Sequence, residues 1–161
     1  MENYIMLNGK RIDLTAEQIE TLVGKKEKDP FERVGNGEKY FYISWDGEVE
    51  EDYEEDIEYD NALFNVANYC TDKEIMKQRA LHETLNRLLW RYSMQNGGRD
   101  LDMFSGAWVL YFCESGDKWK TIDNYDTKFE GSIYFADRAT AEAAIEEIVI
   151  PFMEKHPEFR W

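Results

Sequence analysis

The stretch TDKEIMKQRALHETLNRLLWRYSMQNGG, residues 71–98, predicts the helix around which the rest of the chain folds. It opens on the capping box Thr71-Asp72-Lys73-Glu74 and ends at Gly97-Gly98. At 1.5 Å per residue this helix is about 35 Å long, enough to cross a whole domain. Apolar side chains recur on one of its faces at three- and four-residue steps: Leu81, Leu85, Leu88, Leu89 and Tyr92. The other side carries bases that we expect to hold part of an acidic stretch in place: Lys73, Lys77, Arg79, Arg87 and Arg91.

The N-terminal residues predict a hairpin followed by a short helix. Tyr4 to Leu7 and Arg11 to Leu14 flank Asn8-Gly9, a pair that supplies the positive φ angles of a two-residue turn. Thr15-Ala16-Glu17-Gln18 is a second capping box, and the helix that it opens ends near Gly24. The polar residues 25–30 then read as a linker.

Further strands are predicted where β-branched and aromatic residues gather between turn signals. Asn61 to Tyr69 reads as an irregular connector or a short helix, and Asp137 is expected to cap a last helix that Pro151 kinks or ends. In this helix Ala143, Ala144, Ile148 and Phe152 should face inward. The strand candidates are Phe31 to Val34, Lys39 to Trp45, Ala107 to Cys113, Trp119 to Ile122 and Ser132 to Phe135.

These elements predict an α+β fold in which an antiparallel sheet packs against one long central helix and a C-terminal helix. A length of 161 residues with 43% apolar side chains fits a single domain with a real core. We divide it into an N-terminal hairpin–helix unit (1–24), a linker (25–30), a main body (31–155) and a tail (156–161).

Composition bounds the location and the partners. The sequence has no run of about 18 uncharged apolar residues and does not open with a signal-peptide pattern, so we expect a soluble, cytoplasmic protein. In that setting Cys70 and Cys113 should be reduced thiols. A formal net charge of −15 repels nucleic acids and anionic membranes, so basic proteins become the favoured partners.

Most of this charge lies in DGEVEEDYEEDIEYD, residues 46–60, which we call the acidic stretch. Val49 and Ile57 are its aliphatic anchors, and we expect a partly extended edge or loop held at its ends. Fully extended, fifteen residues would span about 50 Å with one charge per about 5 Å, of the same order as the phosphate spacing along a DNA strand. Such a surface can imitate nucleic acid in a basic groove. The alternative is a solvated loop that only keeps the protein soluble.

Interleaved aromatic and aliphatic residues favour the interface over the solvated loop, because a solvating segment has no need of them. The predicted partner-binding residues are Glu48, Glu50, Glu51, Asp52, Tyr53, Glu54, Glu55, Asp56, Glu58, Tyr59 and Asp60.

Catalytic signals are weak, and we predict no enzyme, cofactor or metal. His82 and His156 are the only histidines, and neither lies in a nucleophile or metal motif. Together with Cys70 and Cys113 they lack the close spacing of a structural zinc site. Asp100 and Asp102 would be the candidates for a magnesium-dependent nuclease or phosphotransfer site, the weakest of the functional alternatives.

The order of motifs FERV, GEKYFYI, DGEV, NVANYCTDKE, LNRLLWRYSMQNGG and a late IYF resembles a family of small acidic uncharacterised proteins of phages and prophages of Gram-positive bacteria. The resemblance covers Met1 to about Met153 and carries no catalytic residues. Cys70 stands where an aromatic residue is expected, which indicates a packing variant.

The resemblance implies an anti-CRISPR-like setting. We therefore expect a phage-encoded, non-enzymatic inhibitor of a host defence nuclease, with a Cas effector or other basic nucleic-acid-binding defence protein as partner. The alternative is a structural or accessory protein of phage replication or assembly, in which the long helix and the aromatic strands form a homo-oligomer interface.

Overall fold

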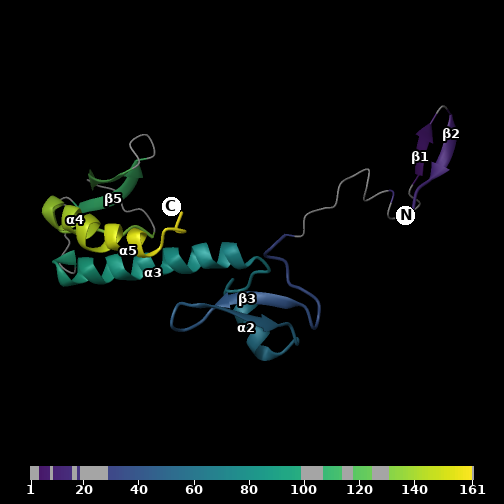
Figure 1. Cartoon of the computed structure of the whole chain (residues 1–161), viewed down its shortest axis with the longest axis horizontal. Helices are drawn as coiled ribbons and strands as arrows, with labels where there is room; N and C mark the ends of the chain where they lie inside the picture. The colour runs from purple at the N-terminus through teal and green to yellow at the C-terminus, as the bar shows by residue number, and fades with distance from the viewer. Residues whose placement is uncertain are drawn as a thin grey trace.

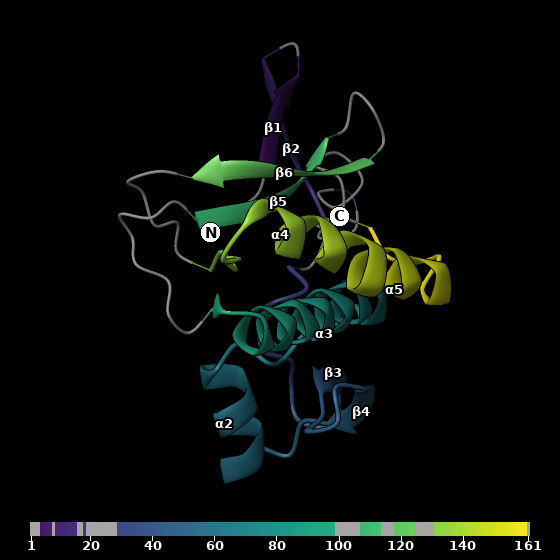
Figure 2. The same ribbon diagram turned by 90° about the vertical axis from the view of Figure 1, so that its left-hand side faces the viewer.

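The computed structural model describes residues 4–7, 9–15, 18, 29–98, 107–113, 118–124 and 131–160. Helix α3, Lys73–Gln95, is the longest of the described elements, and the elements that pack on it lie on two sides (Figures 1 and 2). Helices together with antiparallel strands confirm the predicted α+β class. One side of α3 carries β3 (Lys39–Ile43), β4 (Val49–Tyr53) and α2 (Glu58–Asn65), and the other carries β5 (Ala107–Cys113), β6 (Lys118–Asn124), α4 (Arg138–Ala144) and α5 (Ile150–Lys155).

In the described part of the chain the strands form three separate two-stranded antiparallel sheets, so the prediction of one sheet is wrong. The physical reason is the position of α3. It separates the β3–β4 hairpin from the β5–β6 hairpin (Figure 2), and strands of one sheet must approach to about 4.8 Å.

The predicted N-terminal hairpin is confirmed. β1 (Tyr4–Leu7) pairs with β2 (Lys10–Asp13), Gly9 has a positive φ of 77°, and the hairpin lies apart from the other described elements (Figure 1). The Thr15 N–H donates to Gln18 Oε1 at 3.0 Å and the Gln18 N–H to Thr15 Oγ1 at 3.2 Å, as in the predicted capping box. The helix predicted after it and linker residues 25–28 lie outside the described residues.

Helix α3 begins one residue later than the predicted capping box implies. Asp72 is its N-cap, because the Asp72 carboxylate accepts from the Glu74 N–H at 2.8 Å and from the Ile75 N–H at 3.2 Å. The Thr71 hydroxyl instead donates to the Pro30 carbonyl at 3.3 Å, which ties the start of the helix to the preceding body of chain.

The two sides of α3 contribute to different apolar clusters. Its second half packs against α4, α5 and β5, and its first half packs against β3. A third cluster lies on the far face of β3, against α2. The buried members are Leu85, Leu89, Phe135, Ala141, Ala144, Val149, Phe152 and Phe159 in the first cluster, Ile43, Cys70, Met76 and Ala80 in the second, and Tyr40, Tyr42 and Tyr69 in the third.

The C-terminal helix continues through Pro151 and does not end there. Asp137 caps it as predicted, accepting from the Thr140 N–H at 2.7 Å. Between α4 and α5, residues Ile145–Val149 form a π-helical segment. The wider turn accommodates a proline that lacks an N–H, and it rotates the following residues by one position. Val149 is therefore fully buried, and the predicted Ile148 is partly buried against the same core.

Two local predictions are wrong. Phe31 to Val34 form a turn and loop, because the hydrogen bonds of Arg33 to Glu54 hold this segment against the acidic stretch. Of Ser132 to Phe135, only Phe135 makes a β-bridge, to Trp108. The described tail packs on α3: the Gln78 side chain donates to the Glu158 carbonyl at 2.8 Å, and Phe159 is buried.

Candidate partner-binding surface

The acidic stretch is built into three consecutive structures: the hairpin turn, strand β4 and the start of helix α2. The register pairs Ile43 with Val49 and Tyr40 with Asp52. Since the stretch becomes helical at Glu58, a single extended span of about 50 Å is not formed. The predicted partly extended edge is confirmed for Val49–Tyr53 only.

The β3–β4 hairpin lies between two helices. Successive side chains of a strand point to opposite faces. Phe41 and Ile43 therefore face α3, whereas Tyr40 and Tyr42 face α2. Both faces of β3 are covered, and its acidic partner β4 holds the outer position.

Three tyrosines of the apolar cluster beside α2 donate hydroxyl protons to carboxylates of the acidic stretch. Tyr40 donates to Asp60 at 2.7 Å, Tyr42 to Glu50 at 2.7 Å, and Tyr69 to Glu54 at 2.9 Å. The rings of Tyr40 and Tyr69 stack with centroids 4.1 Å apart. Burial and the hydrogen bond to Glu54 together raise the pKa of Tyr69 to about 12, so these hydroxyls stay protonated donors at neutral pH.

Glu54 is held mainly by Arg33. The guanidinium donates to both carboxylate oxygens, from Nη2 at 2.7 Å and from Nε at 3.0 Å, and also reaches Asp56 at 3.3 Å. Arg33 Nη1 donates to the Asn61 side chain at 2.7 Å. The hydrogen bond from Arg33 is the largest cause that lowers the pKa of Glu54, and it outweighs the opposing effect of burial. Glu54 is therefore an ionised, internally neutralised carboxylate.

Asp60 fastens the loop to the start of α2. Burial alone would raise its pKa, but hydrogen bonds from the Glu55 N–H, the Tyr40 hydroxyl and the Ile57 N–H lower it overall. The two backbone donors lie 2.9 and 3.2 Å from Asp60 Oδ2. Residue Asp56, between them, has a positive φ of 58°, a conformation that aspartate tolerates better than most residues.

Two of the predicted partner-binding residues are therefore not on the surface. Glu54 is 2% exposed and Asp60 is 1% exposed, because both serve as internal hydrogen-bond acceptors. Asp52 is half-buried. The remaining predicted residues are exposed: Glu48, Glu50, Glu51, Tyr53, Glu55, Asp56, Glu58 and Tyr59.

The sequence reasoning missed the most exposed aromatic side chain beside this surface. Trp45, at the hairpin turn directly before Asp46, is 95% exposed. Ile57, read as an anchor, is 48% exposed and so is available to a partner. The signal that could have found Trp45 is its place next to Asp46-Gly47, since a residue at a tight hairpin turn has few neighbours to cover it.

The bases of α3 do not form the ion pairs that hold the acidic stretch among the described residues. Those pairs come from Arg33 and from Lys39, whose Nζ lies 2.9 Å from Glu51. Lys77 and Arg79 pair with Glu74 and Glu83 of their own helix. Lys73 supplies only a longer-range attraction, which adds to the lowering of the Glu51 pKa that Lys39 dominates.

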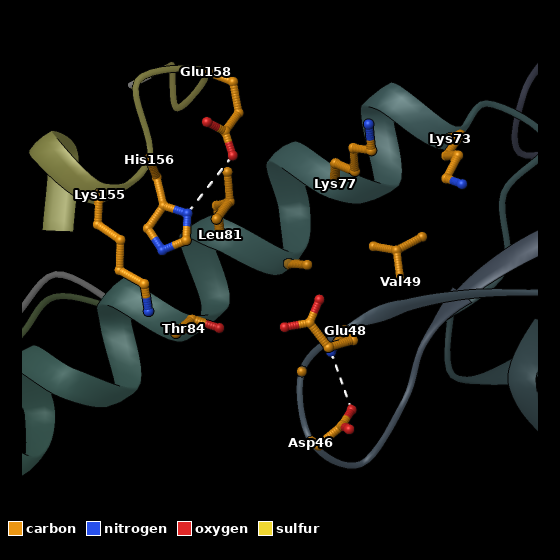
Figure 3. Close-up of a pocket in the computed structure, with 12 residues that line it drawn as sticks. Asp46, Glu48, Val49, Lys73, Lys77, Leu81, Thr84, Lys155, His156 and Glu158 are labelled. Atoms are coloured by element: carbon orange, nitrogen blue, oxygen red, sulfur yellow. Dashed lines mark hydrogen bonds and ion pairs between the residues drawn. The ribbon is translucent and has the colours of Figure 1, made fainter.

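A polar cleft of about 460 Å³ opens between the hairpin turn, the first half of α3 and the end of α5 (Figure 3). Glu48 and Val49 line it from the hairpin, and Lys73 and Lys77 line it from α3. His156 lies at the opposite wall, with its Nδ1 3.6 Å from Glu158. Charges of both signs share this space, and it gives room for side chains beside the start of β4.

The candidate metal and catalytic residues are dispersed. Cys70 is buried beside β3, and Cys113 ends β5. The His82 ring contacts the Arg160 carbonyl at 2.8 Å. Among the described residues, no group of three or more His, Cys, Asp or Glu side chains is placed to hold a metal ion. Asp100 and Asp102 lie outside these residues.

Comparisons with protein-family models, with curated proteins and with solved structures found no match to this chain. The resemblance to small acidic phage proteins therefore stays a prediction. A search of the helices in the described part of the chain found none with the length and apolar character needed to span a bilayer.

Proposed function

We propose that the protein is a non-enzymatic inhibitor that blocks the basic groove of a host defence nuclease with its acidic stretch. The observation that supports this most is the combination of exposed carboxylates with exposed apolar anchors on one fastened unit. Trp45, Tyr53, Ile57 and Tyr59 lie among the acids, and all four side chains are at least 47% exposed. Acidic residues give steering and fast association, whereas aromatic anchors give a stable complex.

The internal bonds of Glu54 and Asp60 add to this argument. A loop that only solvates the protein needs no fixed shape. Here an arginine and three tyrosines bond to carboxylate side chains of the acidic stretch and fix its shape, so the exposed carboxylates are presented from a preorganised frame, which lowers the entropy cost of binding.

The test combines capture with inhibition. Tagged protein is incubated with lysates of bacteria that carry CRISPR-Cas and other defence systems, and the captured nuclease is purified and assayed for cleavage. We expect release between about 0.1 and 0.5 M salt, where the screening length falls to several Å, and inhibition that excess nucleic acid relieves. The variant Glu48→Lys/Glu55→Lys should lose inhibition at least tenfold.

The matched control is Glu146→Lys/Glu154→Lys, which changes the net charge equally at two exposed residues of the C-terminal helix. This control should inhibit like the wild type. If both variants lose inhibition equally, the loss comes from net charge alone. Full inhibition by Glu48→Lys/Glu55→Lys would exclude the acidic stretch as the inhibitory surface.

The alternative of an assembly protein has one observation in its favour. Ile122 and Tyr111 of the β5–β6 hairpin and Trp90 of α3 are 51%, 38% and 59% exposed. Apolar residues on such surfaces suit an oligomer interface. Sedimentation in 0.1 and 0.5 M salt separates the two functions, since an apolar oligomer persists at high salt.

A further inference from the structure

The backbone of the β3–β4 hairpin, and not only its charge, has groups that a partner can bind. In an antiparallel pair, alternate residues of each strand exchange hydrogen bonds with the partner, and the residues between them point their N–H and C=O groups outward. The Ser44 N–H donates to the Glu48 carbonyl at 2.8 Å, and the Glu54 N–H donates to the Glu38 carbonyl at 3.0 Å. These bonds fix which residues of β4 face outward: Val49, Glu51 and Tyr53.

The opposite edge of this hairpin is already filled. Phe41 exchanges backbone hydrogen bonds with Cys70, at 2.7 and 3.0 Å. The Asn68 side chain accepts from the Ile43 N–H at 2.9 Å and donates to the Ile43 carbonyl at 2.7 Å, so that it replaces a neighbouring strand. Within the described residues, no strand pairs with the outer edge of β4.

The side chains of β4 select what this edge can accept. Glu50 and Asp52 lie on one face, and a second copy would place like charges beside them, which disfavours pairing. On the other face, Val49 is apolar and Glu51 is already paired with Lys39. The cleft beside Val49 leaves room on that face for further side chains (Figure 3).

We propose that β4 binds its partner by strand addition, and that the partner supplies an extended segment in which basic and apolar residues alternate. Basic side chains of this segment lie beside Glu50 and Asp52, and apolar ones lie beside Val49. The inference rests on the proposed function for the basic character of the partner, and it adds the backbone conformation in which the partner is recognised.

The probe is an acetylated, amidated peptide of alternating lysine and valine. Its control is the same peptide methylated at every backbone nitrogen, which keeps the charge and removes the donors. Binding is measured by calorimetry at one fixed ionic strength, and amide exchange of the protein is followed by NMR. We expect the unmethylated peptide to bind at least tenfold more tightly.

Amide exchange supplies the evidence that charge alone cannot give. The N–H groups of Val49 and Glu51 should exchange at least tenfold more slowly in the complex. Those of Glu50 and Asp52 should change little, because the hairpin ladder already protects them. This alternation along one strand is the signature of strand addition.

A variant pair tests the same edge. Glu51→Pro removes the outward donor at a position where an edge strand tolerates proline, and Glu51→Gln removes the same charge and keeps the donor. Only Glu51→Pro should abolish the preference for the unmethylated peptide. If Glu51→Pro disturbs folding, the amide-exchange measurement on the wild type still tests strand addition.

The outcomes separate this inference from the proposed function. Equal binding of both peptides without protection of Val49 and Glu51 overturns strand addition and leaves a charged binding surface. Absence of binding by both peptides overturns strand addition as well, and it also counts against a basic partner for the acidic stretch.

Discussion

Arg33 lies where the acidic stretch turns from strand to helix, and the acids there fall into a buried and an exposed group. Glu54 and Asp60 accept hydrogen bonds inside the protein, whereas neighbours such as Glu55 and Glu58 face solvent. The function of a carboxylate in this stretch is thus determined by its donors more than by its charge.

We expect Glu54→Gln to lower the free energy of unfolding by about 2–4 kcal/mol, because it leaves Arg33 without its main counter-ion and disturbs the Tyr69 hydrogen bond. Urea denaturation at pH 7 measures this loss. Glu55→Gln, at an exposed neighbour, should change stability by less than about 0.5 kcal/mol. Similar losses in the two variants would show that burial of Glu54 has no energetic consequence.

The cost of Glu54→Gln should also depend on pH. The pKa of Glu54 is lower in the folded protein than in the unfolded chain, so the unfolded chain takes up the proton first as the pH falls. The stabilisation is complete above the ordinary glutamate pKa of about 4.3 and is lost as the pH falls through the folded pKa. The stability difference between wild type and variant should therefore be constant from pH 6 to 8 and shrink below about pH 4.3. A difference that stays constant down to pH 3 would contradict this linkage.

The burial of Glu54 and Asp60 could not be predicted from the sequence. Nothing within a few residues distinguishes them from Glu55 or Glu58. Their donors Arg33 and Tyr40 lie 21 and 20 residues away along the chain, and only the folded hairpin brings them together. The sequence shows where the acidic charge gathers, but it does not show that Glu54 and Asp60 are buried.

At the scale of elements, short-range signals gave the better predictions. The Asn-Gly turn, the period of α3 and the Asp137 cap all depend on neighbours within one turn, and all are confirmed. The prediction of a strand at Phe31 to Val34 is wrong, because a pattern of four residues does not reveal long-range contacts such as those of Arg33. The division into separate sheets depends on where α3 packs, which no local pattern encodes.

The N-cap of α3 gives a direct test of one such correction. Asp72→Ala should cost about 1 kcal/mol, because it removes the acceptor for two free N–H groups of the first turn. Thr71→Ala should cost less, since the bond of the Thr71 hydroxyl to the Pro30 carbonyl, at 3.3 Å, does not cap an N–H group of the helix. Thermal unfolding of both variants, followed by circular dichroism, measures the difference. A larger loss of stability in Thr71→Ala than in Asp72→Ala would show that Thr71 is the N-cap.

Asn68 should stabilise β3 more than its position in a connector suggests. Asn68→Ala leaves the N–H and C=O of Ile43 without these partners, and we expect a loss of about 1–2 kcal/mol by urea denaturation. Asn65→Ala, at an exposed site at the end of α2, is the control and should have little effect. Equal stability of both variants would mean that water replaces the Asn68 amide at no cost.

At the scale of the whole molecule, α3 belongs to two cores at once. Met76 and Ala80 pack toward the β3–β4 hairpin, whereas Leu85 and Leu89 pack toward α4 and α5. A helix propagates cooperatively, so loss of either core should loosen both halves. The exposed acidic surface and the C-terminal core are therefore mechanically connected through one element.

We expect Met76→Ala to reduce the amide-exchange protection around Leu89 as well as around Met76, although Leu89 lies in the other core. Phe135→Ala should do the converse, with an overall cost of about 3–5 kcal/mol because Phe135 is fully buried. Residue-resolved hydrogen exchange checks both variants. Loss of protection confined to the mutated side would show that the two halves of α3 open independently.

The contacts between residues 158–160 and α3 have a consequence for biosynthesis. Gln78 and His82 bind backbone groups 78 to 82 residues further along the chain. At 5–20 residues per second, a ribosome needs roughly 4–16 s to add those residues. By then the β3–β4 hairpin already has its apolar partners on α3, Met76 and Ala80. The leucine face of the second half is covered first by β5 and fully only when the C-terminal helix emerges, so part of this apolar face stays open after the acidic surface is complete.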